Sequence, residues 1–186
     1  LVGSEMCIRD SSIIGKDLDS LADDVSFGVA PSLIVFSLFK EMDYSGAMES
    51  LAGVFPYLAF LLSVFSALRL AKFNNDTRQT SSFVGLPVPA NALFWASLVT
   101  GAHDWLVSSN FHPVYLLLLV CLFSWLLVSE IPMFSLKFKN LSWKDNKTSF
   151  IFLLVCIPFL IFLGICSFSA IIVWYILLSL ITRKSK

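Results

Sequence analysis

The sequence has little charge: only 14% of its 186 residues are Asp, Glu, Lys or Arg, and the formal net charge is zero. It has two histidines and four cysteines, and it lacks a Cys-x2-Cys pair, a P-loop, a dinucleotide-binding glycine pattern, HExxH and GxSxG. Without a basic excess there is no indication of a nucleic-acid partner, and we expect none. No polar segment is long enough for a separate soluble domain.

Apolar sequence is what the chain has in abundance, with 57% hydrophobic and 15% aromatic residues and a mean hydropathy of +0.82. A soluble domain of this length would need more polar surface, whereas a bilayer selects apolar runs of about 20 residues. The sequence therefore predicts an all-α fold, a polytopic membrane helical bundle. Cys121, Cys156 and Cys166 lie inside apolar runs, and we expect them to be small buried hydrophobic residues.

Six membrane spans are predicted from five apolar runs. The runs fall at 25–39, 51–71, 90–108, 113–131 and 149–182. As one helix the last run would reach about 51 Å, against a hydrocarbon core of about 30 Å. Gly164, Ser167 and Ser169 lie near its middle. We therefore divide it into a helical hairpin, with one span over 149–165 and the other over 167–182.

The positive charges agree with six spans. If the end that carries Asp19 and Asp23 is cytoplasmic and the spans alternate, every Lys and Arg except Lys40 falls on the cytoplasmic side. A single span over 149–182 would instead export the basic tail at 183–186. The favoured topology has both ends of the chain in the cytoplasm.

Two carboxylates spaced by one helical turn precede the first apolar run. Gly15, Asp19 and Asp23 drift only about 40° per step and share one stripe of a helix. Charge near hydrocarbon is costly and tends to mark an ion or substrate site, while a solvated acidic first turn is the structural alternative. Asp17 is expected to face elsewhere, and Asp24 could flank Asp23.

A basic cluster follows the second apolar run on the same predicted side of the membrane. Arg69 lies at a depth where a guanidinium could bind phosphate or carboxylate, with Lys72 and Arg78 nearby. A cation that snorkels at the end of a span is the structural alternative for Arg69. The segment 85–89, Gly-Leu-Pro-Val-Pro, is expected to be a rigid turn before the next span.

The outer side of the membrane offers only weak site candidates. His103 and His112 are predicted there with Asp104 nearby, across the membrane from the acidic stripe. We do not expect these residues to share a catalytic site with the stripe or to form a metal site.

These segments resemble the CDP-alcohol phosphatidyltransferase family. The stretch from Gly15 to Pro31 is similar to the second half of that family's signature, D-x2-D-G-x2-A-R-x8-G-x3-D-x3-D. Within the family, Asp-Ser-Leu-Ala-Asp with Ser-Phe-Gly-Val-Ala-Pro is similar to the CDP-diacylglycerol–serine O-phosphatidyltransferases, most closely Bacteroidota-like members. The segments 69–74 and 80–91 resemble the same subgroup, and the similarity runs to about Ile181.

The resemblance implies a membrane enzyme in which serine attacks CDP-diacylglycerol, giving phosphatidylserine and CMP. It implies that Asp19 is a metal ligand and that Asp23 is the general base, with a further contact to a metal. The metal would be Mg²⁺ or Mn²⁺, and Gly15 would allow close approach of the nucleotide. Arg69 and Arg78 are weaker candidates, for binding phosphate or the serine carboxylate.

The resemblance further implies that the partners are CDP-diacylglycerol, L-serine and membrane lipids. It implies that the protein lies in the bacterial inner membrane, with its active site facing the cytoplasm. A homodimer is compatible with it.

The resemblance is incomplete at its start. The first half of the signature, with two earlier aspartates, is absent, as are two preceding helices of an expected eight. Residues 1–11 look like an extraneous adapter, so we expect 12–186 to be a partial family domain. We expect the chain as written to have no turnover and to bind the metal pair weakly.

Two alternatives remain at this point. Within the family, the acceptor could be another alcohol, such as glycerol 3-phosphate or inositol, although the segments from Arg69 to Ala90 favour serine. From another class, Asp19 and Asp23 could form the cation site of a small transporter. A transporter should have polar residues in the middle of several spans, where this chain has mainly small Ser, Thr and Cys groups and Asn91.

Overall fold

The computed structural model describes residues 13–44, 46–75, 83–133 and 146–182, which form six helical segments. The segments are, in order, α2 (Ile13–Asp24) with the π-helix η1 (Val25–Val29) and α3 (Ala30–Glu41); the 3-10 helices η2 (Gly46–Leu51) and η3 (Phe55–Phe60) with α4 (Leu61–Asn75); α5 (Val88–Val107); α6 (Pro113–Val128); α7 (Lys147–Phe162); and the 3-10 turn η5 (Gly164–Cys166) with α8 (Ser167–Ile181). The all-α membrane bundle predicted from composition is confirmed.

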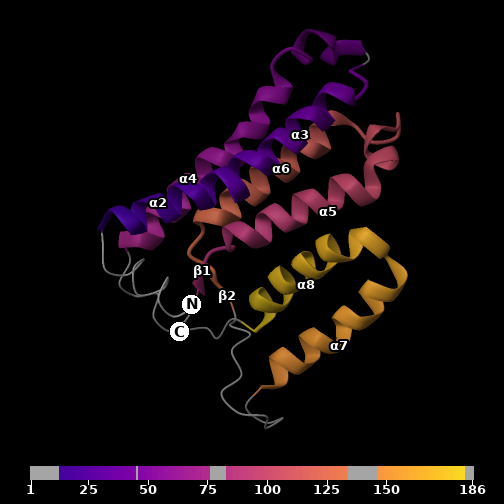
Figure 1. Cartoon of the computed structure of the whole chain (residues 1–186). Coiled ribbons are helices and arrows are strands. Elements are labelled where there is room, and N and C mark those ends of the chain that lie inside the picture. The colour runs from indigo at the N-terminus through magenta and orange to yellow at the C-terminus, as the bar shows by residue number, and fades with distance from the viewer. Residues whose placement is uncertain (1–12, 45, 76–82, 134–145, 183–186) are drawn as a thin grey trace.

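The helices pack in an order that follows the chain only in part (Figure 1). α3 packs against η3 and α5, α4 packs against α6, and α8 lies between α5 and α7. The core between these helices includes Trp95, Phe94 and Phe123, with the rings of Phe94 and Phe123 stacked at 3.9 Å between centroids. The apolar residues of the predicted runs thus form both this core and the outer surface.

Within the described ranges, three helical segments are long and apolar enough to cross a membrane by length and composition: Asp17–Glu41, Phe55–Asn75 and Gly164–Ile181. α6 and α7 are shorter apolar helices of 16 residues. Large apolar side chains are exposed on their outer faces, including Leu154, Ile161 and Phe162 of α7. An exposed surface of this composition suits lipid rather than water, so the chain is membrane-associated.

The division of the last apolar run into a hairpin is confirmed. α7 ends at Phe162, Gly164 has a φ of +53°, and η5 leads into α8, which packs back along α7. A positive φ is strained for residues other than glycine, so Gly164 suits the reversal. Ser167 donates a hydrogen bond of 2.6 Å to the carbonyl of Gly164 at the same turn.

The first span and the acidic stripe belong to one continuous helical segment. The apolar run predicts a span from about residue 25, but helix begins at Ile13 and continues to Glu41 through η1. The wider π turn of η1 was not predicted; such bulges in α-helices occur frequently at functional sites. Ser32 of α3 donates a 2.7 Å hydrogen bond back to the carbonyl of Gly28 in η1.

The rigid turn predicted at 85–89 joins α5 to the end of α6. Gly85, with a φ of +76°, donates a backbone hydrogen bond to the carbonyl of Ile131, and Leu86 donates one to Leu126. A Cβ on Gly85 would lie 2.7 Å from the carbonyl oxygen of Leu127, so only glycine fits. The adjoining strands β1 (Phe83–Val84) and β2 (Pro132–Met133) form a short antiparallel pair that was not predicted. The turn at 85–89 therefore has a structural role at the end of α6.

Small polar residues join α5 to α8. The hydroxyls of Ser97 and Ser169 lie 2.5 Å apart, and Ser169 donates a hydrogen bond to the carbonyl of Phe94. A Cβ on Gly101 would lie 2.5 Å from the sulfur of Cys166, so the backbones here approach closely. Small residues and interhelical hydrogen bonds are the usual means by which membrane helices associate.

The cysteines only partly match the prediction of burial. Cys156 is buried and Cys166 is half-buried against Gly101, but Cys121 is exposed on the surface of α6. The prediction is wrong for Cys121 because an apolar run supplies both the inner and the outer face of a membrane helix. Cys7 lies outside the described residues.

Candidate active site

The acidic stripe lies on α2, as the spacing predicts. Gly15, Asp19 and Asp23 fall within this helix, and each is half-buried. At about 100° per residue, Asp19 and Asp23 lie on the other side of the helix from Asp17 and Leu21, which line the groove between α2 and α4. The two carboxylates therefore share a face that is turned away from α4.

The ends of α2 and α4 that carry the acidic and basic residues lie together (Figure 1). Asn74, in the last turn of α4, donates a 2.7 Å hydrogen bond from its side-chain amide to the hydroxyl of Ser20. Ser20 directly follows Asp19, and Asn74 lies five residues after Arg69. The prediction that the acidic pair and the basic cluster lie at the same end of the bundle is confirmed for Arg69 and Lys72; Arg78 lies outside the described residues.

Arg69 is buried rather than solvated. Its relative exposure is 7%, and its guanidinium lies 5.8 Å from the ring centroid of Phe73 and interacts electrostatically with Tyr175 of α8. Its Nε has no hydrogen-bond partner among the described residues. A snorkelling cation would extend its charged group into water, so the structure does not support that alternative. A buried guanidinium with a free N–H is suited to bind an anion.

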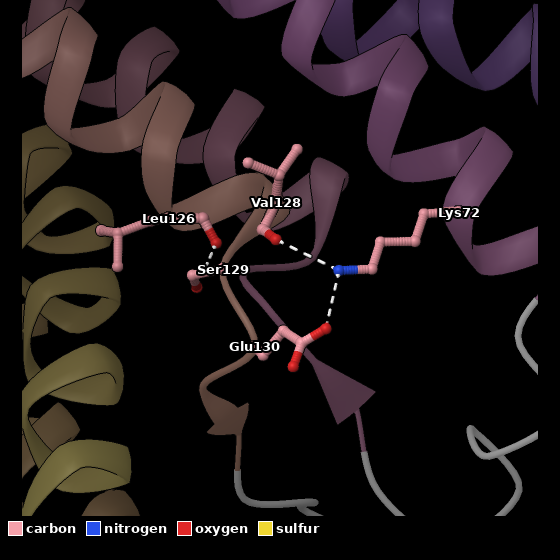
Figure 2. A network of polar contacts seen from close by, with 5 residues as sticks. All are labelled: Lys72, Leu126, Val128, Ser129 and Glu130. Carbon is pink, nitrogen blue, oxygen red and sulfur yellow. Dashed lines mark hydrogen bonds and ion pairs between the residues drawn. The ribbon is translucent and has the colours of Figure 1, made fainter.

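Lys72 lies three residues after Arg69 on α4, and its side chain points toward the end of α6 (Figure 2). Its ammonium lies 3.3 Å from a carboxylate oxygen of Glu130 and 3.5 Å from the carbonyl oxygen of Val128. Figure 2 also shows Ser129, whose hydroxyl donates a 2.9 Å hydrogen bond to the carbonyl of Leu126. Both partners of the ion pair are exposed, so this contact contributes little stability.

A groove of about 610 Å³ separates α2 from α4. It is lined by Asp17, Ser20, Leu21, Asp24, Ala67, Leu70, Ala71, Asn74 and Asn75. Among the described residues of the lining there are two carboxylates and no Lys or Arg, so they favour a ligand with positive charge or several hydrogen-bond donors.

Asp24 and Ser66 lie next to Gly28, where the first helical segment packs against α4. A Cβ added to Gly28 would collide with Oδ1 of Asp24 and would lie 3.0 Å from the Cβ of Ser66. Oδ1 of Asp24 and the hydroxyl of Ser66 are both buried, and neither has a hydrogen-bond partner among the described residues. Buried polar atoms are nearly always paired, so these two atoms are candidates for ligand contacts.

The acidic stripe has the right type of ligand for a divalent metal but too few of them. Asp19 and Asp23 are carboxylates on one face, the ligand type that Mg²⁺ and Mn²⁺ prefer. Within the part of the chain that the structure describes, however, no group of three or more His, Cys, Asp or Glu residues is placed to hold a metal. A metal here would need further oxygen ligands beyond these two side chains.

The histidines at the far end of the bundle do not join this site. Nε2 of His103 lies 2.8 Å from a carboxylate oxygen of Glu41, and Nδ1 lies 3.5 Å from Asp104. This contact links the end of α3 to α5, while His112 accepts a weak hydrogen bond from the backbone N–H of Val114. That these residues form no metal site stays a prediction.

Sequence reasoning missed Ser66 and gave Asp24 only a flanking role. Ser66 is three residues before Arg69 and on the same buried face of α4, a spacing that could have drawn attention to it. For Asp24 no such signal exists, because its contact depends on the π turn and on Gly28.

Comparison with known proteins identifies several relatives of one kind. The chain is 33% identical over 120 residues to the CDP-diacylglycerol–serine O-phosphatidyltransferase of Bacillus subtilis (strain 168), covering 64% of the chain and 58% of that protein. It is 31% identical over 189 residues to the protein of the same name from Helicobacter pylori (strain ATCC 700392 / 26695), covering 95% of the chain and 74% of that protein.

A third relative comes from an archaeon. The archaetidylserine synthase of Methanothermobacter thermautotrophicus is 35% identical over 91 residues, which is 48% of the chain and 35% of that protein. No family model matches the chain. The chain thus spans between about a third and three quarters of the length of these relatives.

Proposed function

Because the chain belongs to the CDP-alcohol phosphatidyltransferase family, we propose that the full-length protein transfers the phosphatidyl group of CDP-diacylglycerol to L-serine. The products are phosphatidylserine and CMP. The observation that carries this proposal is that α2, which carries the acidic pair, lies together with the end of α4 that carries Arg69, joined by the hydrogen bond between Ser20 and Asn74. An acidic pair beside buried and exposed cations suits a phosphate-bearing substrate and its attacking alcohol.

In this proposal Asp23 takes the proton from the serine hydroxyl as that oxygen attacks the phosphorus of the diacylglycerol-side phosphate. A carboxylate within hydrogen-bond reach of the hydroxyl makes the oxygen a stronger nucleophile, and CMP leaves with the electrons of the broken P–O bond. Gly15, one turn before Asp19, leaves room for the nucleotide beside the helix backbone.

Asp19 and Asp23 would also hold a divalent metal, Mg²⁺ or Mn²⁺, together with oxygen ligands from elsewhere. Such an ion supplies positive charge that lowers the cost of the negative charge developing on the pyrophosphate. Arg69, with its free and buried Nε, would bind a phosphate or the serine carboxylate, and we assign the same role to Arg78.

The reaction is proposed to take place at the cytoplasmic face of the bacterial inner membrane. The described cations at this end of the bundle, Arg69 and Lys72, together with the charge distribution of the whole sequence, support a cytoplasmic position. Serine and the nucleotide are water-soluble and CDP-diacylglycerol is a lipid, so a site at the membrane surface suits all three.

The test is a lipid assay of the full-length protein in detergent micelles containing CDP-diacylglycerol and Mg²⁺ or Mn²⁺. Radiolabelled L-serine, glycerol 3-phosphate and inositol are offered separately, and the lipid product and CMP are measured. We expect a labelled lipid and equimolar CMP with serine, and loss of both on addition of EDTA. Preferential labelling with glycerol 3-phosphate or inositol would contradict the proposed acceptor, and CMP release unaffected by EDTA would contradict the metal.

A further inference from the structure

Asp24 has a carboxylate oxygen that the described structure leaves without a donor. Its Oδ1 lies against Gly28 in the π turn and is buried between the first helical segment and α4. Removing a carboxylate oxygen from water is costly unless a hydrogen bond or a cation replaces the lost hydration. The proposed reaction, with Asp23 as base, does not use this oxygen.

Ser66 presents a second unsatisfied atom at the same place. Its side chain is fully buried, its hydroxyl has no partner among the described residues, and its Cβ adjoins the same Gly28 position as Oδ1 of Asp24. Asp24 and Ala67, the neighbour of Ser66, both line the groove of about 610 Å³. The groove therefore reaches Asp24, while Ser66 is buried beside it, behind the lining of the groove.

The chemistry of this position selects a donor-rich cation. A carboxylate accepts only, and a hydroxyl can accept as well, so a bound group must donate hydrogen bonds. The described residues that line the groove include two carboxylates and no Lys or Arg that could donate to them. An ammonium group supplies three N–H donors and a positive charge.

We propose that Asp24, assisted by the hydroxyl of Ser66, binds the ammonium group of the acceptor and selects an amino alcohol over an uncharged polyol. This inference rests on the proposed function. In serine the hydroxyl and the ammonium are on adjacent carbons, and Asp23 and Asp24 are adjacent residues about 100° apart around the helix. The proposed base and the ammonium site are therefore consecutive side chains of α2. Glycerol 3-phosphate and inositol have no ammonium group to place there.

The experiment compares wild-type full-length protein with Asp24→Asn, which keeps the shape of the side chain and removes its charge. Steady-state kinetics are measured with L-serine and with L-glycerate, in which a hydroxyl replaces the ammonium. We expect the KM for serine to rise roughly ten- to hundredfold, the scale of a lost charge-assisted hydrogen bond. The KM for CDP-diacylglycerol should change less than twofold, and the preference for serine over glycerate should fall by a similar factor to the rise in KM.

Asp43→Asn is the matched control, because Asp43 is an exposed carboxylate outside the lining of the groove. It should leave the KM for serine within twofold of wild type. An equal rise in Asp43→Asn and Asp24→Asn would mean that only the overall charge of the protein matters, and it would overturn the inference. So would an unchanged KM for serine in Asp24→Asn.

Failure of this inference can be separated from failure of the proposed function. If the wild-type protein makes no phosphatidylserine, the proposed function is wrong. If it does make that lipid and Asp24→Asn binds serine as well as wild type, only the role of Asp24 is wrong. Thermal unfolding of each variant in detergent shows whether a change in KM reflects a loss of folded protein; Asp24→Asn should unfold at the wild-type temperature.

Discussion

The contact between α2 and α4 and the contact between α5 and α8 both contain buried serines, but the serines differ in what they bind. Between α5 and α8, Ser97 and Ser169 bond to each other, and Ser169 also donates to the backbone of Phe94. Beside α2, the hydroxyl of Ser66 and Oδ1 of Asp24 have no partner among the described residues. Polar groups that satisfy one another hold helices together, whereas unsatisfied ones leave bonding capacity for a ligand.

The two contacts also use glycine differently. At Gly101 the missing side chain lets α5 approach the backbone and sulfur of Cys166. At Gly28 it makes room for the carboxylate of Asp24 as well as for α4. We therefore expect substitutions near α2 to change activity more than stability, and substitutions between α5 and α8 to do the reverse.

The largest effect on activity should come from Asp23→Asn, in the region of α2 and α4 to which we assign the chemistry. Removing a general base lowers kcat by about 10²- to 10⁴-fold. The unfolding temperature in detergent should stay near wild type, because Asp23 is half-buried and lies on the face of α2 turned away from α4. Radiolabelled serine incorporation and thermal unfolding measure the two quantities.

Glu130→Gln is a suitable control for Asp23→Asn, since Glu130 is an exposed carboxylate in an ion pair at the same end of the bundle. It should retain nearly full activity. Wild-type turnover in Asp23→Asn would show that Asp23 is not the base. A large loss of stability in this variant would show that the Asp23 side chain has a structural role in α2.

The next largest effect should come from Gly101→Val, which lies in the contact between α5 and α8 and should lower the stability of the protein. The added atoms would overlap with the sulfur and backbone nitrogen of Cys166, 2.5 and 2.8 Å from the Cβ position. Overpacking of this kind typically costs about 1–3 kcal/mol of unfolding free energy. Thermal or denaturant unfolding in detergent should show the loss, while the KM for serine in the remaining folded protein should not change.

Gly53→Ala is the matched control for Gly101→Val, because no atom lies within 4 Å of a Cβ added at Gly53. It should unfold like wild type. Equal stability of the Gly101 and Gly53 variants would show that α5 and α8 are not held by close backbone contact.

The smallest effects are expected from two single serine substitutions, one in each contact. Ser97→Ala removes a hydrogen bond between helices, which in membrane proteins contributes about 0.6 kcal/mol on average. Ser66→Ala removes a hydroxyl that has no partner in the described structure, so it should not lower the unfolding free energy. Ser66→Ala should instead raise the KM for serine modestly. The opposite ranking of the two variants in stability would contradict the distinction between paired and unpaired polar groups.

Much of the fold follows from the amino-acid sequence because bilayer thickness restricts the length of helices. The predicted runs correspond to the helical segments, and Gly164 marks the hairpin between α7 and α8 as expected. Composition could not predict which side of each helix faces lipid, as exposed Cys121 shows. Both faces of a membrane helix are apolar, so no hydrophobic period distinguishes them.

By itself, the sequence determined the all-α membrane fold, the helical stripe of Asp19 and Asp23 and its likeness to a family motif, because length, hydropathy and spacing are local properties. Only the tertiary structure decided that Arg69 is buried and that Asp24 turns toward α4 beside Ser66. The position of Asp24 beside Ser66 depends on a π turn and on the absence of a side chain at Gly28. Such contacts join residues about 40 positions apart in the chain, and no local pattern encodes them.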